Sequence, residues 1–135
     1  MFAPKGSFSS FSVDDVARAR EFYGQTLGLS VSDGAMGTLE LSMPEGHTIF
    51  VYPKDNHEPA TFTVLNLVVD DVEAAVDELN AAGVQTKIYD DPGLPTDDKG
   101  IARGMGPDIA WFKDPAGNVI SVINPGSAGP DSAAP

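Results

Sequence analysis

Two stretches of the sequence, SVDDVARAREFYGQTLGL at residues 12–29 and VVDDVEAAVDELNAAGV at residues 68–84, decide the fold. Both contain the segment Val-Asp-Asp-Val, which begins at Val13 in the first copy and at Val69 in the second, 56 residues later. Each copy follows a short apolar-rich run and begins an amphipathic helix. A chain that repeats one strand–helix unit is expected to build two similar halves around a shared cleft. The sequence therefore predicts that function lies in that cleft.

The composition excludes several functional classes. A formal net charge of −12, from 20 acidic and 8 basic residues, argues against nucleic acid and against anionic membrane surfaces as partners. The absence of cysteine excludes disulfides, thiolate catalysis and cysteine-ligated zinc. No apolar stretch approaches the roughly 18 residues that span a bilayer, and the N-terminal residues do not resemble a signal peptide. We therefore expect a cytoplasmic protein with no membrane partner.

The first copy predicts the element order β-α-β-β-β. Residues 7–13 alternate as a strand, and Asp14 or Asp15 caps the helix that follows and ends at Gly28. Further strands are expected near residues 29–32, 38–43 and 47–52, with a turn at Asp33-Gly34 between the first two. A polar linker after Pro53 then leads to the second copy.

The second copy repeats the order. A strand at residues 62–69 precedes a helix in which Asp70 and Glu73 resemble a capping box and which Gly83 ends. Strands are expected at 84–89, 108–113 and 118–123, the last two joined by a turn that starts at Asp114. The long loop 91–106, which contains Gly93, Gly100, Gly104 and Gly106, is expected to act as a mobile lid. The tail, residues 125–135, lacks large apolar residues and is expected to be flexible.

The helix AREFYGQTLGL at 19–29 and the turn DPAGN at 114–118 together resemble the vicinal oxygen chelate superfamily. That superfamily includes glyoxalase I, extradiol dioxygenases, fosfomycin-resistance enzymes and bleomycin-binding proteins. The resemblance implies an α+β fold in which tandem β-α-β-β-β repeats, about 7–54 and 62–124, form an open mixed-sheet barrel. It also implies a single glyoxalase-like domain over residues 1–124. The fold hosts several reactions, so it does not choose one.

The resemblance also locates the metal ligands that such proteins carry, usually histidine and glutamate. Counting from the shared motifs places Phe8, Phe50, Val64 and Ser121 at those positions. Three of these have no donor atom, and a divalent ion needs three or four nitrogen or oxygen ligands. The sequence therefore predicts that the usual metal ligands are not retained and that no metal or other cofactor is bound.

The chain has two histidines, His47 at the start of a strand and His57 in the linker. One interpretation makes both solvated loop residues. The other places His57 over the cleft, where it contacts a ligand or acts as a general base oriented by Glu58. A non-standard metal site built on either histidine is the third alternative.

The remaining candidates come from strand parity. Ser10 and Ser12 share the face of Phe8, and Asn66 shares that of Val64. These polar groups either bind a ligand or bond to one another and to buried water. Trp111 either lines the pocket or belongs to the core. The predicted ligand-binding residues are Phe8, Ser10, Ser12, Phe50, Tyr52, Asn66, Trp111 and Ser121.

Three functions remain open at this point. The first is a binding protein that holds an apolar or aromatic small molecule in a metal-free cleft without transforming it. The second is a lyase, isomerase or dioxygenase-type enzyme of the same superfamily, with unknown catalytic residues. The third is a protein without a ligand that acts through dimerisation. The sequence does not decide whether the chain is a homodimer.

Overall fold

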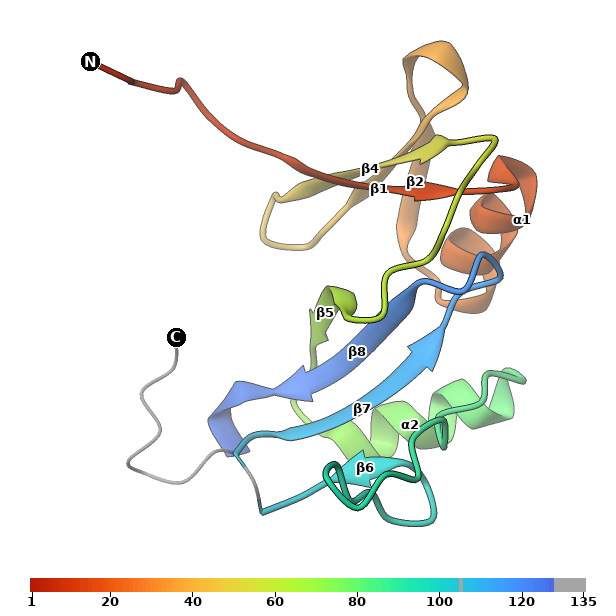
Figure 1. The fold of residues 1–135 in the computed structure, drawn as a ribbon, viewed down its shortest axis with the longest axis vertical. Helices are drawn as coiled ribbons and strands as arrows, with labels where there is room; N and C mark the ends of the chain where they lie inside the picture. The colour runs from red at the N-terminus through yellow and green to blue at the C-terminus, as the bar shows by residue number, and fades with distance from the viewer. Residues whose placement is uncertain (105, 128–135) are drawn as a thin grey trace. The chain divides into compact units, whose positions relative to one another are not determined.

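The computed structural model describes residues 1–104 and 106–127, and the chain divides into two compact units, Met1–Pro59 and Ala60–Pro135. Each unit holds one four-stranded mixed sheet and one α-helix (Figure 1). The α+β class and the repeated β-α-β-β-β order are therefore confirmed. None of the helices in the described residues is long and apolar enough to cross a membrane.

The first unit begins with strand β1 (Ser9–Val13) and helix α1 (Val16–Glu21), which continues as one turn of π-helix, η1 (Phe22–Thr26). Strands β2 (Ser30–Asp33), β3 (Leu39–Ser42) and β4 (Thr48–Pro53) follow. The sheet order is β1-β4-β3-β2, with β1 parallel to β4 and the other pairs antiparallel. The connection between β2 and β3 contains a short 3-10 helix, Ala35–Gly37, where the sequence predicts a turn at Asp33-Gly34.

The second unit contains β5 (Thr63–Val68), α2 (Val72–Ala81), β6 (Ile101–Ala102), β7 (Asp108–Lys113) and β8 (Val119–Asn124). The sheet order is β5-β8-β7-β6, which repeats the arrangement of the first unit. As in the first unit, the opening strand is parallel to the last strand, and the remaining pairs are antiparallel.

The two helix starts show the internal repeat most directly. Asp15 caps α1 and Asp71 caps α2, 56 residues later. Their backbone angles agree to within a degree, with φ −139° and ψ 106° at Asp15 and φ −140° and ψ 105° at Asp71. Each carboxylate accepts the backbone N–H three residues on, from Arg18 or Ala74. The prediction that Asp70 caps the second helix is wrong by one residue, because the carboxylate that accepts the free backbone N–H group is that of Asp71.

The predicted strand at 84–89 is also wrong. The strand that pairs with β7 on the edge away from β8 is β6, at Ile101–Ala102, inside the segment expected to be a lid. Residues 84–89 are instead held by side chains: Asn80 Nδ2 donates to the Val84 carbonyl, and Thr86 Oγ1 donates to the Lys99 carbonyl at 2.7 Å. The segment is fixed by contacts distant in sequence, which its local pattern did not reveal.

The C-terminal tail was expected to be flexible from residue 125. Pro125–Ser127 form a short 3-10 helix, η3, in which the backbone N–H of Gly126 donates to the Asn124 side chain. Residues 128–135 lie outside the described residues.

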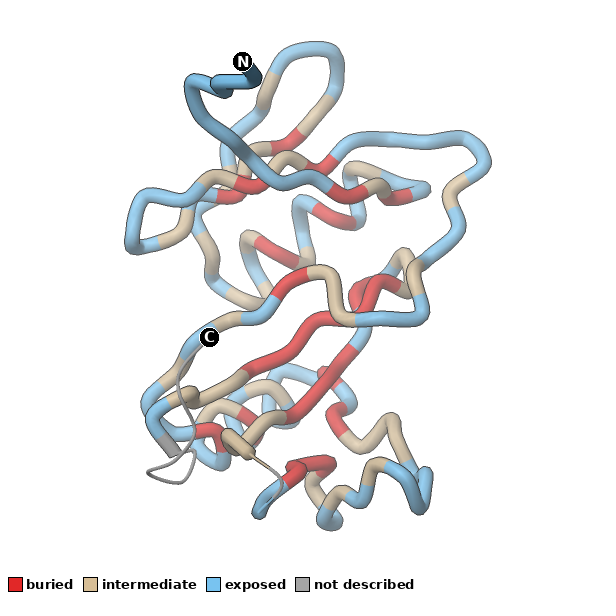
Figure 2. Tube along the Cα trace, turned by 60° about the vertical axis from the view of Figure 1, so that its left-hand side comes forward, coloured by how far each residue is buried: buried red, intermediate tan, exposed pale blue. Residues whose placement is uncertain are grey.

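Figure 2 shows that the buried residues of each unit gather on the strands and on the helix. In the first unit Phe11 contacts the fully buried Tyr23 of η1, with ring centroids 5.9 Å apart. In the second unit α2 packs on β7 and β8, and Phe112 and Ile120 are fully buried. Since alternate strand residues face opposite sides, the other face of each sheet carries a different set of side chains.

Candidate functional site

The face of the first sheet opposite Tyr23 is rich in aromatic and hydroxyl groups, and we call it the aromatic face. It comprises Phe8, Ser10, Ser12, Phe50 and Tyr52, because Ser10 pairs with Phe50 and Ser12 with Tyr52 across β1 and β4. The Phe8 and Phe50 rings meet edge to face, with centroids 4.8 Å apart. Phe8 is nevertheless 67% exposed and Tyr52 36% exposed. A large apolar surface on this face is therefore accessible within the unit.

The linker histidine belongs to the same face. Ser12 Oγ and His57 Nδ1 are 2.7 Å apart and form a partly buried hydrogen bond between groups 45 residues apart in sequence. The bond fixes the orientation of the imidazole ring beside Tyr52, the strand partner of Ser12. His57 is thus half-buried and bonded through its ring, whereas His47 is exposed. Contact of His57 with a ligand and its orientation by Glu58 stay predictions.

On the second sheet, three predicted site residues form a continuous row across the strands, which we call the donor row. Asn66 of β5 pairs with Ser121 of β8, and Ser121 pairs with Trp111 of β7. Ser121 is completely buried, and its hydroxyl donates to Asn66 Oδ1 at 2.6 Å. Asn66 itself is exposed. Ser121 therefore positions the amide of Asn66.

Trp111 is largely covered by the segment that precedes β6. Its ring packs edge to face against Tyr89, with centroids 5.2 Å apart, and Leu94 and Ile88 belong to the same apolar cluster. Trp111 retains 8% exposure. The indole therefore belongs to a small core, and its role in lining a pocket stays a prediction. Tyr89 and Leu94 were not singled out from the sequence, because only the tertiary fold brings the segment 88–94 over β7.

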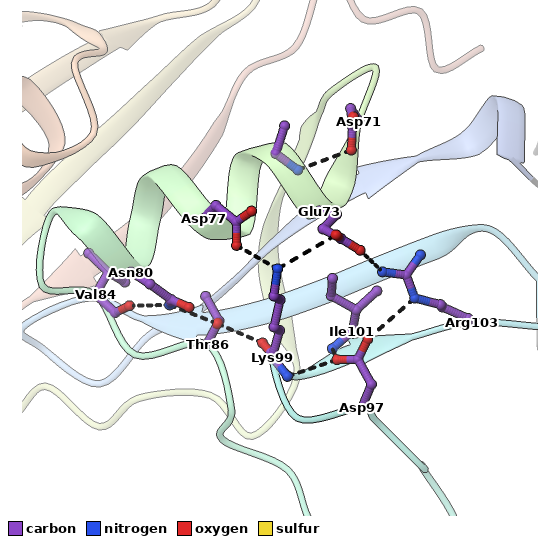
Figure 3. Close-up of polar contacts among 11 residues, drawn as sticks. Asp71, Glu73, Asp77, Asn80, Val84, Thr86, Asp97, Lys99, Ile101 and Arg103 are labelled. Carbon is purple, nitrogen blue, oxygen red and sulfur yellow. Dashed lines mark hydrogen bonds and ion pairs between the residues drawn. The ribbon is translucent and has the colours of Figure 1, made fainter.

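A network of ion pairs holds the segment 97–103 on helix α2 (Figure 3). Lys99 Nζ lies 2.9 Å from Asp77 and 3.6 Å from Glu73, and Arg103 lies 2.7 Å from Glu73 and 3.3 Å from Asp97. The hydrogen bond to Asp77 is the main reason that the pKa of Lys99 is raised. The part of the predicted lid that contains β6 is therefore anchored.

Asp97 organises the turn at the centre of this network. Its Oδ1 accepts the backbone N–H groups of Lys99 and Ile101, both at 2.9 Å, while Oδ2 accepts from Arg103. Desolvation is the largest single influence and raises the pKa of Asp97, but the two backbone donors together with Arg103 outweigh it. The pKa is accordingly lower than its ordinary value of 3.8. The pKa of Arg103 is raised, first of all by its hydrogen bond to Asp97.

The four positions at which the resemblance implies metal ligands occupy equivalent places in the two sheets. Phe50 pairs with Ser10, just as Ser121 pairs with Asn66, and Ser10 and Asn66 are 56 residues apart. Phe8 contacts Phe50 through its ring, and Ser121 bonds to an amide. Within residues 1–104 and 106–127, no three histidine, cysteine or acidic side chains group to hold a metal ion. These residues do not fit a metal centre at the usual positions.

A sequence model of the Glyoxalase/Bleomycin resistance protein/Dioxygenase superfamily matches residues 8–122. The chain therefore belongs to this superfamily. No curated protein sequence matches it.

Solved structures with the same fold have several functions. TnmS3, an antibiotic binding protein from Streptomyces sp. CB03234, is 25% identical; the match covers 92% of this chain and 99% of that one, with a TM-score of 0.66. A glyoxalase/bleomycin resistance protein from the same organism is 26% identical, with coverage of 87% and 100% and a TM-score of 0.60. Lactoylglutathione lyase from Agrobacterium tumefaciens is 17% identical, with coverage of 90% and 95% and a TM-score of 0.62, which shows the fold alone.

Proposed function

We propose that this protein binds an apolar or aromatic small molecule without a metal, and that the aromatic face of the first unit and the donor row of the second each offer contact groups for such a ligand. The observation that carries the proposal is the ring pair of the exposed Phe8 and the half-buried Phe50, at positions where the resemblance implies metal ligands. Aromatic rings offer a large, rigid contact area, and burying apolar surface contributes about 25 cal/mol per Å² before the costs of association. The likeness to TnmS3, which is described as an antibiotic binding protein, supports the same function.

The polar groups of these faces would orient the ligand. Ser10, Ser12 and Tyr52 offer hydroxyls on the aromatic face, and Asn66 and Trp111 offer N–H groups on the donor row. An apolar surface with a few well-placed polar groups is the usual composition of a small-molecule site. The net charge of −12 favours neutral or cationic ligands at long range.

The proposal is tested by thermal-shift measurements with a panel of neutral polycyclic aromatic compounds, followed by calorimetric titration of those that raise the melting temperature. Phe8→Ala should weaken binding by about 10-fold or more, because it removes the exposed ring of the pair. Phe2→Ala is the matched control, since Phe2 is 90% exposed and lies outside the strands. Equal affinities for the two variants, or no compound that shifts the native protein, would refute the proposal.

A second candidate is a metal-independent enzyme of the same superfamily, such as a lyase or an isomerase. The hydrogen bond between Ser12 and His57 favours it, because a positioned imidazole can act as a general base. Nuclear magnetic resonance of each bound compound after prolonged incubation distinguishes the two functions. New signals that His57→Gln abolishes and His47→Gln retains would establish catalysis, and unchanged spectra would establish a binder.

A further inference from the structure

The donor row indicates which chemical group the ligand carries; this inference rests on the proposed function. Ser121 is fully buried, so its hydroxyl needs a hydrogen-bond partner inside the protein. It finds this partner in Asn66 Oδ1 at 2.6 Å. A primary amide has one oxygen acceptor and one nitrogen with two donor hydrogens. With the oxygen turned toward Ser121, the Nδ2 group of the exposed Asn66 is directed away from it.

Asn66 Nδ2 donates no hydrogen bond to any of the described residues, in contrast to Asn80 and Asn118, whose amides are bonded inside the protein. The serine fixes the amide, and the amide nitrogen faces solvent. A donor held in one orientation loses little conformational freedom when a ligand accepts its hydrogen.

Trp111 supplies a second donor in the same row. Its Nε1–H bonds to none of the residues in 1–104 and 106–127. Among those residues no buried side-chain nitrogen or oxygen lacks a partner, so the indole N–H of Trp111 is within reach of solvent. Trp and Asn side chains separated by one intervening strand have Cα atoms about 10 Å apart, which a bicyclic or tricyclic molecule can span.

The charge on this face agrees with the two donors. Lys113, two residues after Trp111 on β7, shares its face, is exposed and forms no ion pair with the described residues. None of the strand residues of β5, β7 and β8 on this side is acidic, although the chain as a whole carries 20 acidic residues. The face therefore offers two hydrogen-bond donors and one positive charge.

We propose that the donor row recognises an aromatic ligand through an oxygen acceptor, a ring carbonyl or a carboxylate, that accepts the hydrogen of Asn66 Nδ2. Trp111 contributes its indole edge and its N–H, and Ser121 is a positioning residue that acts through Asn66. The amide and the indole thus select for an oxygen atom on the ligand, whereas the apolar contacts of the site select for its aromatic skeleton.

Three probes of the same shape test the acceptor: fluorene, which has none, 9-fluorenone, which has a neutral carbonyl, and fluorene-9-carboxylate, which has an anionic one. By calorimetric titration, at least one oxygen-bearing probe should bind the native protein about 3- to 10-fold more tightly than fluorene, the range expected of one or two net hydrogen bonds. A preference for the ketone indicates a neutral acceptor, and a preference for the carboxylate indicates that Lys113 takes part.

Variants assign the preference to its residues. Asn66→Leu keeps the size of the side chain, removes the donor and should bring the ratio of affinities close to one. Ser121→Ala should lower the ratio less, because the amide remains but can rotate. Trp111→Phe keeps an aromatic ring and removes the N–H, and so measures the contribution of that donor. Gln25→Leu, an exposed amide on η1, is the control and should leave the ratio unchanged.

The outcomes separate the two proposals. If all three probes bind with equal affinity, or if Asn66→Leu keeps the native ratio, the acceptor inference is wrong and the proposed binding function stands. If none of the probes nor any compound of the aromatic panel binds, the proposed function is wrong and the inference fails with it.

Discussion

Replacement of Gly100 by alanine should destabilise the second unit far more than the same change at Gly83. Gly100 has φ +86°, and a Cβ there would collide with the backbone carbonyl of Thr86 and crowd the Cα of Lys87. Gly83 has nearly the same dihedral angle, φ +87°, but a Cβ there would meet no atom within 4 Å. The pair therefore separates the cost of the left-handed conformation from the cost of the collision.

The magnitude follows from three contributions. The left-handed conformation costs a non-glycine residue about 1–2 kcal/mol in both variants. Backbone cannot yield as a flexible side chain can, so the overlap in Gly100→Ala adds about 1–3 kcal/mol. Displacement of Thr86 also weakens its 2.7 Å hydrogen bond to the Lys99 carbonyl, worth about 1 kcal/mol. We expect a loss of about 3–6 kcal/mol for Gly100→Ala against about 1–2 kcal/mol for Gly83→Ala.

Urea denaturation measures the difference, with the fluorescence of Trp111 as the signal. Trp111 is the only tryptophan of the chain and lies in the same unit as both glycines, in an apolar cluster with Tyr89. Free energies of unfolding that agree within about 0.5 kcal/mol for the two variants would refute the close approach of Gly100 to Thr86.

Three further predictions follow. Because the pKa of Asp97 is lowered in the folded chain, its ionised form stabilises the protein above pH 3.8, and this contribution is lost as the pH falls through the lowered value. Asp97→Asn should therefore cost up to about 1 kcal/mol of unfolding free energy at pH 7 and little near pH 2, as measured by denaturation at each pH. Asp114→Ala should cost about 2–4 kcal/mol in the same assay, because the buried carboxylate accepts the backbone N–H groups of Ala116 and Asn118 and the side-chain N–H of Asn118. The control, Asp55→Ala, at an exposed linker position, should change stability by less than about 0.5 kcal/mol. Purified and dialysed protein should contain less than a tenth of an equivalent of zinc, nickel, manganese or iron by elemental analysis, a rough detection limit for tight binding, and one equivalent would contradict the assignment of Phe8, Phe50, Val64 and Ser121 to the ligand positions.

The sequence determined the repeat and most of its local structure. The recurrence of Val-Asp-Asp-Val at an interval of 56 residues placed both strand–helix units, because a short carboxylate before an apolar helical stripe defines a helix start through local hydrogen bonds. Alternation along the strands correctly placed Ser10 opposite the Phe11 core, and Asn66 on the face opposite Leu65. These are properties of neighbouring residues, which a linear pattern records.

Only the tertiary structure decided the parts that depend on distant partners. The segment 84–89 has a strand-like pattern, but β6 at Ile101–Ala102 takes the place beside β7. The earlier segment is bonded through the side chains of Asn80 and Thr86 instead. The bond between Ser12 and His57 and the bond between Ser121 and Asn66 join residues 45 and 55 positions apart. Strand parity states the face on which a side chain lies, whereas sheet order and register decide which side chains meet there. That is the physical reason why the candidate residues could be predicted one by one but their arrangement could not.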